Sequence, residues 1–342
     1  MKRIMIILAM LLLAKALSGQ TIEKEPDVFV IAHLNEKIPS TSNIVYAPTF
    51  RASWTILKNE IIGADIILTS PLSLTAGLNH YPFSVPDNND WLAMAGFVEK
   101  GILKEINKAM QKKFGIRETG LEGFIDNEGI VCYSYLSKTL KFVSTFETLS
   151  WDFLSKGRSQ TVECFGVSKG EGKDKEAMRE QVSIHDYRNP DDFIIRISSK
   201  EPGKEIILAK IPRGGTMSGM IKEIDERIDL PGKEKPSEID ELVIPKIEFD
   251  IEHSYNELLG IFLKNKGFED YFFARAVQKI GFTLDESGAV ARATGEIILK
   301  KGPRSRLYIF NKPFMAILRD TGSSEPDLVV WVANTDILQV IE

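Results

Sequence analysis

The chain has few of the residues on which metal sites and disulfide frameworks depend. Its 342 residues include two cysteines, Cys132 and Cys164. Two cysteines can form one bridge in an oxidising compartment, or they can remain as two buried thiols. The four histidines are scattered without metal-ligand spacing: His33, His80, His185 and His253. The composition therefore predicts no metal site and no cofactor.

A basic excess and a long apolar run are also missing. The net charge of −5 argues against nucleic acid as a partner, because phosphate binding requires a basic surface. The apolar run at residues 4–14 is about 11 residues long, whereas a membrane-spanning helix needs about 20. It follows Lys2 and Arg3 and precedes small residues, which is the layout of a secretory signal peptide. We expect residues 1–20 to be removed, with a retained anchor as the alternative.

The remaining residues, 21–342, are enough for one large domain or two ordinary ones, and the protein is expected to be secreted or periplasmic and to make no membrane contact. No G-x-S-x-G elbow, Walker loop or G-x-G-x-x-G fingerprint is present. Residues 214–219 come nearest to a phosphate-binding loop but lack its lysine. The sequence therefore predicts no catalytic residues and a protein that is not an enzyme.

Hydrophobic periodicity predicts a mixed α+β fold. Helices are expected at residues 91–114, 217–228 and 254–266, and a solvated turn at residues 169–180. From residue 271 onward the chain is rich in β-branched and aromatic residues, which favours strands. Helices thus dominate the first part of the chain and strands the last.

The segment at residues 285–306 has an unusual alternation of small residues. Every second position carries a methyl group or a hydrogen: Ala289, Ala291, Ala293 and Gly295. In a strand these side chains share one face, and that face can be buried without polar or steric penalty. The alternative is an alanine-rich solvent loop or an ordinary edge strand.

Two motifs around this segment resemble those of the serpin superfamily. Residues 284–289, Leu-Asp-Glu-Ser-Gly-Ala, are similar to the hinge of the serpin reactive loop. Residues 310–315, Phe-Asn-Lys-Pro-Phe-Met, resemble the F-N-K/R-P-F segment that follows the loop. Gly288 and Phe314 are 26 residues apart, as a full-length serpin loop requires. Weaker matches follow the family order at residues 43–48, 105–108, 131–147 and 244–247, so the chain is identified as a divergent, shortened serpin of the exported, bacterial type.

The resemblance implies that residues 21–342 form a single domain with a serpin-like fold. This fold has a large central β-sheet, additional sheets, N-terminal helices and an exposed reactive-centre loop at about residues 286–306. It also implies a suicide-substrate inhibitor, whose loop is cleaved by a protease and then inserts into the central sheet. The implied hinge residues are Glu286, Gly288, Ala289, Ala291, Ala293 and Gly295. The implied partner is a serine endopeptidase, with a cysteine protease as the second class, and the implied state is a monomer.

The cut site is expected in the scissile region Lys300, Lys301, Gly302 and Pro303. Family spacing places the acyl-side residue at Gly302, but proteases cut poorly before Pro303. A shift of one residue gives the bond between Lys301 and Gly302, which suits a trypsin-like enzyme. Lys300 and Arg304 are further basic candidates. The alternative is a basic loop tip that is merely nicked.

The chain also departs from the family pattern. The family's central shutter uses Ser, Ser, Asn and His, but the matching positions here are Ala47, Phe50, Ser134 and Gln278. The Trp expected at the top of the sheet corresponds to Phe142. Because a buried polar network needs every member satisfied, the shutter must be rebuilt or absent. The departures leave a second function open, a non-inhibitory serpin-fold binding protein whose loop or surface engages a ligand or protein partner.

Overall fold

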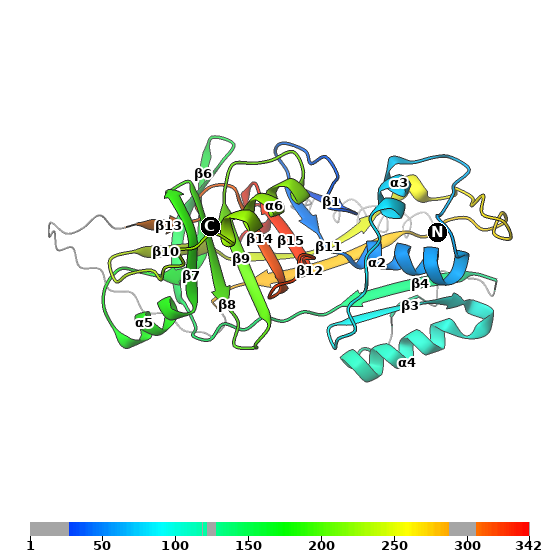
Figure 1. Ribbon diagram of the computed structural model, residues 1–342, viewed down its shortest axis with the longest axis horizontal. Helices are drawn as coiled ribbons and strands as arrows, with labels where there is room; N and C mark the ends of the chain where they lie inside the picture. The colour runs from blue at the N-terminus through cyan, green and yellow to red at the C-terminus, as the bar shows by residue number, and fades with distance from the viewer. Residues whose placement is uncertain (1–26, 118, 122–127, 287–305, 342) are drawn as a thin grey trace, which may run out of the picture.

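The computed structural model describes residues 27–117, 119–121, 128–286 and 306–341 (Figure 1). Its largest sheet has seven strands in the order β1-β2-β15-β14-β9-β8-β7. The strands are β1 (Val28–Ile31), β2 (Asn43–Tyr46), β7 (Val182–Asn189), β8 (Asp192–Ser198), β9 (Lys204–Lys210), β14 (Phe314–Asp320) and β15 (Leu328–Val332). Helix α6 (Met217–Ile228) buries Met217, Met220 and Ile224 against one face of this sheet.

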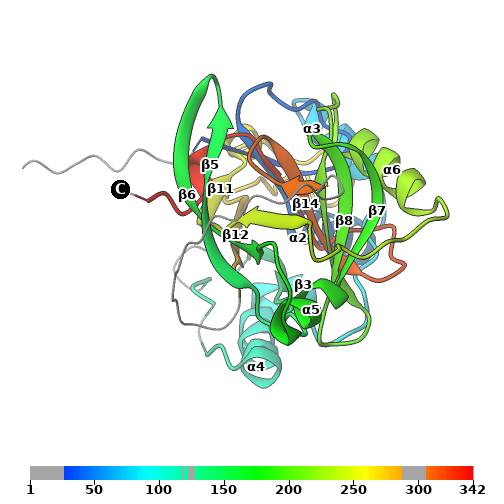
Figure 2. The same cartoon turned by 90° about the vertical axis from the view of Figure 1, so that its left-hand side faces the viewer.

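A four-stranded sheet covers the other face, in the order β13-β10-β6-β5. Its strands are β5 (Glu147–Ser155), β6 (Arg158–Val167), β10 (Glu241–Pro245) and β13 (Leu307–Ile309), and α5 (Lys173–Glu180) lies beside β6. Phe153 and Phe165 of this sheet share a core with Phe193 and Phe314 of the larger one. Figure 2 shows the resulting layers, with β5 and β6 on one side, β8 and β14 in the middle and α6 on the other side.

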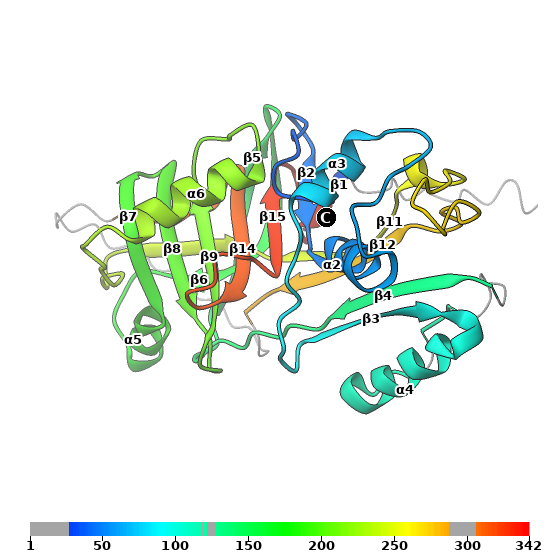
Figure 3. The same ribbon diagram turned by 45° about the vertical axis from the view of Figure 1, so that its right-hand side comes forward.

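The remaining strands form two antiparallel ribbons. One pairs β3 (Trp91–Phe97) with β4 (Ile130–Leu136), and the other pairs β11 (Ile247–Ser254) with β12 (Val277–Leu284). In Figures 1 and 3, β4 and β12 run side by side and point the same way. No β-ladder joins them in the part of the chain that the structure describes. The two ribbons therefore form a divided sheet.

The β3–β4 ribbon is packed on both faces. Helix α2 (Thr49–Ile56), continued by the π-helix η1 (Leu57–Ile62), covers one face, and α4 (Ile102–Phe114) covers the other. On the α4 side, Ile106 and Met110 pack with Met94 and Tyr133. The short helices are α3 (Ser73–His80), η2 (Val98–Lys100), η3 (Asn256–Leu258) and η4 (Thr335–Ile337).

The helix expected at residues 217–228 is confirmed with the same bounds, whereas the helix expected at residues 91–114 is wrong in its first half. Residues 91–97 form β3, and only residues 102–114 are α-helical. The run Trp-Leu-Ala-Met-Ala-Gly-Phe lies between two helices, so both of its faces are covered. It therefore lacks the alternation that distinguishes a strand from a helix.

Two further expectations are wrong. Residues 169–180 are not only a turn, since α5 forms within them and buries Arg179 against the backbone carbonyls of Ser168 and Gly170. Residues 254–266 contain only the 3-10 turn η3. Gly260 adopts a left-handed φ of 74°, and the following residues form backbone bonds across the chain, such as Thr69 N to Phe262 O at 2.9 Å. These long-range bonds replace the helical ones.

The two cysteines are free thiols. Cys132 lies in β4 and Cys164 in β6, which belong to different sheets. Burial raises the pKa of each thiol to about 12, so both are protonated at neutral pH. Of the two possibilities that the sequence left open, the structure has the pair of unbridged thiols.

Among the described residues, no helix is long and apolar enough to cross a membrane.

Candidate functional site

The candidate site begins where β12 runs into the hinge. Glu286 follows β12 and forms an ion pair with Lys246, with 2.8 Å between Nζ and Oε2. Lys246 lies between β10 and β11 and also pairs with Glu163 of β6 at 3.1 Å. The side chains of Lys246 and Glu286 are only 10% and 14% exposed. One lysine thus ties the first hinge residue to two sheets.

This pairing shifts the pKa of both partners. Burial, the largest single influence, would raise the pKa of the Glu286 carboxyl, but the hydrogen bonds that the carboxylate accepts and the charge of Lys246 together outweigh burial, so the pKa is lowered. Burial likewise opposes the charge on Lys246, yet its bonds to Glu286 and Glu163 raise its pKa. Both groups are therefore charged at neutral pH, and the ion pair is formed.

Arg306 is the first described residue after Glu286. Its backbone N–H donates to Asp240 Oδ1 at 2.7 Å, and its guanidinium pairs with Glu234. The guanidinium carbon also lies 5.6 Å from the centre of the Tyr187 ring. Arg306 then leads into β13, which belongs to a different sheet from β12. The segment between Glu286 and Arg306 is thus held at both ends, on separate sheets.

Of the predicted hinge residues, only Glu286 is described. Gly288, Ala289, Ala291, Ala293 and Gly295 lie outside the described residues. So does the predicted scissile region, Lys300, Lys301, Gly302 and Pro303.

Three of the four positions that match the family's shutter, Ala47, Phe50 and Gln278, lie together at the start of α2. Gln278 of β12 is 3% exposed, and its Nε2 donates to Ala47 O at 2.8 Å and to Thr49 Oγ1 at 2.9 Å. Its Oε1 accepts from the Tyr255 hydroxyl at 2.8 Å. The Phe50 ring stacks on the Tyr255 ring, with 3.8 Å between their centres. Every polar atom of the Gln278 amide therefore has a partner.

The fourth position, Ser134 of β4, joins the same helix one turn further on. Its hydroxyl is hydrogen-bonded to the Ser53 hydroxyl at 3.0 Å. Helix α2 thereby holds both ribbons, β12 through Gln278 and β4 through Ser134. The four positions that match the family's shutter therefore belong to hydrogen-bonded and stacked contacts with residues other than the family's.

Sequence reasoning missed three members of this network, Thr49, Ser53 and Tyr255. Thr49 and Ser53 are four residues apart, a spacing that places two hydroxyls on one side of a helix. That pattern was the available signal for two of them. Tyr255 has no comparable signal, because its partner Gln278 lies 23 residues away in sequence.

Phe142 stands where the resemblance expected a tryptophan. It is 8% exposed, and its ring lies 5.1 Å from that of Phe146 and 5.8 Å from that of Phe165. Backbone pairing with Ser199 holds it beside the seven-stranded sheet. A cluster of phenylalanines thus occupies the position of the single larger ring.

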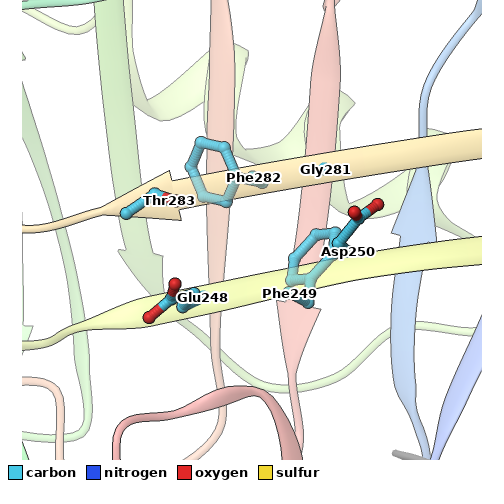
Figure 4. Close-up of a pocket in the computed structure, with 6 residues that line it drawn as sticks. All are labelled: Glu248, Phe249, Asp250, Gly281, Phe282 and Thr283. Carbon is cyan, nitrogen blue, oxygen red and sulfur yellow. The ribbon is translucent and has the colours of Figure 1, made fainter.

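In the described part of the chain, we find no group of side chains near Glu286 or Gln278 arranged like a known catalytic site. A hollow of about 380 Å³ lies along the β11–β12 ribbon. It is lined by Glu248, Phe249, Asp250, Gly281, Phe282 and Thr283 (Figure 4). It contains no histidine, cysteine or lysine. Burial lowers the pKa of His33, His185 and His253, and no group of described side chains is arranged to hold a metal ion.

Comparison with known proteins identifies the arrangement. No protein-family model matches the chain, and no curated protein matches it in sequence. Two solved structures of a tumour-suppressing serpin superpose with TM-scores of 0.52 and 0.51, each at 11% identity, covering 86% and 85% of this chain and 93% and 92% of the other. The chain has the serpin fold.

Serpin48 of the insect Tenebrio molitor is also similar, with a TM-score of 0.48 at 13% identity over 86% of this chain and 92% of the other. The two structures with TM-scores above 0.5 establish the fold and not the activity, because they are only 11% identical to this chain. The resemblance implied a large central sheet with additional sheets, and the described residues form a seven-stranded sheet, a four-stranded sheet and the ribbons β3–β4 and β11–β12.

We predict that Gln278→Ala destabilises the protein by about 2–4 kcal/mol, because it leaves the Tyr255 hydroxyl and the Ala47 carbonyl buried without partners. Chemical denaturation measures the change. The matched control is Gln339→Ala, whose amide bonds to the exposed Glu248 and whose removal should cost less than about 0.5 kcal/mol. Equal losses for the two variants would contradict the assigned role of Gln278.

The ion pair of the hinge makes a pH-dependent prediction. Since the folded-state pKa of Glu286 is lowered, its contribution to stability is present above the ordinary carboxyl pKa and is lost as pH falls through the folded-state value. Glu286→Gln should therefore lower the Tm at pH 7, and the difference in Tm between the variant and the unmodified protein should disappear once the pH falls below the folded-state pKa of Glu286. Glu163→Gln, at the more exposed carboxylate, should have the smaller effect. A gap that does not change with pH would rule out the ion pair as its cause.

Proposed function

We propose that the protein is an exported suicide-substrate inhibitor of serine proteases. The observation that carries this proposal is the divided sheet, since β4 and β12 run in the same direction with no β-ladder between them in the described residues. Each strand therefore offers a free edge to the other side. An added strand that is antiparallel to both would complete a five-stranded sheet.

The proposed insert is the hinge end of the reactive loop. Residues 289–295 supply seven positions, the same number as β4. The small side chains at positions 289, 291, 293 and 295 would face the core, where α2 lies against both ribbons. The hinge begins at the end of β12, so the loop can enter beside that strand by rotating about Glu286.

The proposed reaction begins as ordinary proteolysis. The serine hydroxyl of a trypsin-like protease attacks the carbonyl of Lys301, and the amine of Gly302 leaves with the proton. The loop then remains bound to the protease as an ester through Lys301. Insertion of the freed hinge, as established for serpins in general, would carry the protease along the sheet before water hydrolyses the ester.

The proposal also covers export, domain organisation, oligomeric state and target. Residues 1–20 direct export and are removed, and residues 21–342 act as one serpin-like domain. The protein is not an enzyme, needs no cofactor and acts as a monomer outside the cytoplasm. Its target is a trypsin-like serine endopeptidase, with a cysteine protease as the second class.

One observation favours the alternative, a non-inhibitory binding protein. Opening the sheet would separate groups that α2 now joins, and the Gln278 amide has all of its bonds made. Breaking a satisfied buried network costs more than breaking a partly satisfied one. A protein that retains this network after cleavage would be a substrate or a carrier.

We expect the protein to form a detergent-resistant complex when mixed with trypsin, because the acyl bond survives denaturation. Gel electrophoresis measures it, and residual trypsin activity gives the stoichiometry. Lys300→Ala combined with Lys301→Ala should abolish the complex by removing the basic residue that the trypsin pocket requires. If trypsin yields two fragments and stays active, the inhibitor proposal fails.

The alternation in the hinge gives a matched pair of variants. Ala291→Glu places a carboxylate on the face that would be buried, so it should block insertion and convert the inhibitor into a substrate. Val290→Glu places the same group on the solvent face and should leave inhibition intact.

The Tm after loop cleavage is the second measurement for this pair. Insertion adds a strand, so the Tm of the Val290→Glu variant should rise on cleavage while that of Ala291→Glu should not. Equal behaviour of the two variants would exclude strand insertion in this register.

A further inference from the structure

In the described residues, the outer edge of β3 pairs with no other strand. The backbone bonds Ser137 N to Asp90 O and Val98 N to Gly129 O show that the even-numbered residues of β3 bond to β4. The N–H and C=O groups of Ala93, Ala95 and Phe97 therefore point away from β4. Among the described residues, none of these groups has a hydrogen-bond partner.

The residues of β3 themselves have none of the features that normally protect a strand edge, although Lys113 covers the outward carbonyl of Trp91 at one end. The sequence of β3 contains no proline and no charge, and its seven pairs with β4 are in unbroken register. Proteins usually blunt such edges with bulges, charges or short strands. An uncharged, regular edge of this length is suited to accept another strand.

The other edges of the described sheets are protected. β7 carries two register shifts, β1 has four residues and β13 has three. β5 and the outer strand β11 carry carboxylates along their length. The remaining uncharged edge is that of β4, which faces β12 and is already accounted for by the proposed loop insertion.

Helix α4, which covers one face of the β3–β4 ribbon, and its flanks are basic. Residues 99–117 contain six basic and two acidic side chains in a chain of net charge −5. Lys113 Nζ donates to Trp91 O and to Asn88 O at one end of the edge, and Lys100 Nζ lies 4.6 Å from the centre of the Phe97 ring at the other. Lys104, Lys108 and Lys112 form an exposed ridge on α4, four residues apart.

We propose that the outer edge of β3 binds an extended acidic segment of a partner protein by strand addition. The backbone of Ala93, Ala95 and Phe97 supplies the hydrogen bonds, and the lysines of α4 and its flanks attract the acidic side chains. The site lies on the opposite edge of the β3–β4 ribbon from β12. It therefore does not depend on loop insertion or on protease inhibition.

Charge decides against a second copy of this chain as the occupant. Pairing β3 with β3 of another molecule about a two-fold axis would bring two α4 helices to the same face of the joined ribbons. Each helix carries the Lys104, Lys108 and Lys112 ridge, so like charges would face each other. An acidic strand meets no such repulsion.

The test uses two fluorescent synthetic peptides, one of four Glu-Val repeats and one of four Lys-Val repeats, titrated with the protein and followed by anisotropy. The acidic peptide should bind with saturation and at least about tenfold more tightly than the basic one. Ala95→Pro removes an outward N–H and should weaken binding by at least about tenfold, since proline is tolerated at an edge position.

Two controls separate the edge and the charges from general effects. Ser150→Pro removes an outward N–H from the edge of β5 and should leave binding unchanged. Reversing Lys104, Lys108 and Lys112 to Glu should weaken binding without altering the Tm, whereas reversing Lys264 and Lys266 should not.

Equal binding of the two peptides, or full binding by Ala95→Pro, would overturn the proposal. A dimer in solution that Ala95→Pro dissociates would also overturn it, because the occupant would then be a second copy.

Discussion

The amide of Gln278 is the contact on which the two halves of the divided sheet depend. It joins β12 to the start of α2 through Ala47 and Thr49, and to the segment after β11 through Tyr255. Helix α2 in turn holds β4 through Ser53 and Ser134. Because α2 follows directly on β2 of the seven-stranded sheet, this contact also fixes both ribbons to the main core.

The same contact limits what the sheet can do. A strand that enters between β4 and β12 must displace the ribbons from α2 and break buried hydrogen bonds, which costs free energy unless new backbone bonds replace them. The added strand would form two new ladders, one on each side. In the proposed mechanism, the free energy lost with the buried hydrogen bonds and the free energy gained from the two new ladders together determine whether cleavage of the loop leads to insertion. The ion pair between Lys246 and Glu286 stabilises the arrangement described here at neutral pH, and this contribution is lost when Glu286 is protonated in acid.

Some elements were predictable because their signal is local. The helix at residues 217–228 has one apolar stripe, and Thr216 caps its first turn by accepting from Gly219 N at 3.1 Å. Its bounds follow from the sequence alone. The strand β3 was mistaken for a helix because α2 and α4 cover both of its faces. Residues 254–266 were mistaken because their backbone bonds to Ile67 and Thr69, about 200 residues earlier, outweigh the local helical pattern.

The candidate site likewise has parts that the sequence predicts and parts that it does not. The hinge at Glu286 and its alternating small residues are visible as a motif, since they are contiguous. The ion pair with Lys246 and the bonds of Gln278 are not, because they join residues that become neighbours only when strands from separate sheets meet.

By itself, the sequence determined the α+β class and the likeness to serpins, and it predicts the place of a reactive loop, because all three rest on contiguous residues in a given order. Only the tertiary structure decided that Gln278 bonds to Ala47, Thr49 and Tyr255 and that the thiols of Cys132 and Cys164 lie in different sheets. It also decided that the outer edge of β3 pairs with no other strand in the part of the chain that the structure describes. The physical reason is that hydrogen bonding and burial depend on distance in space, and Ala47 and Gln278 are 231 residues apart along the chain.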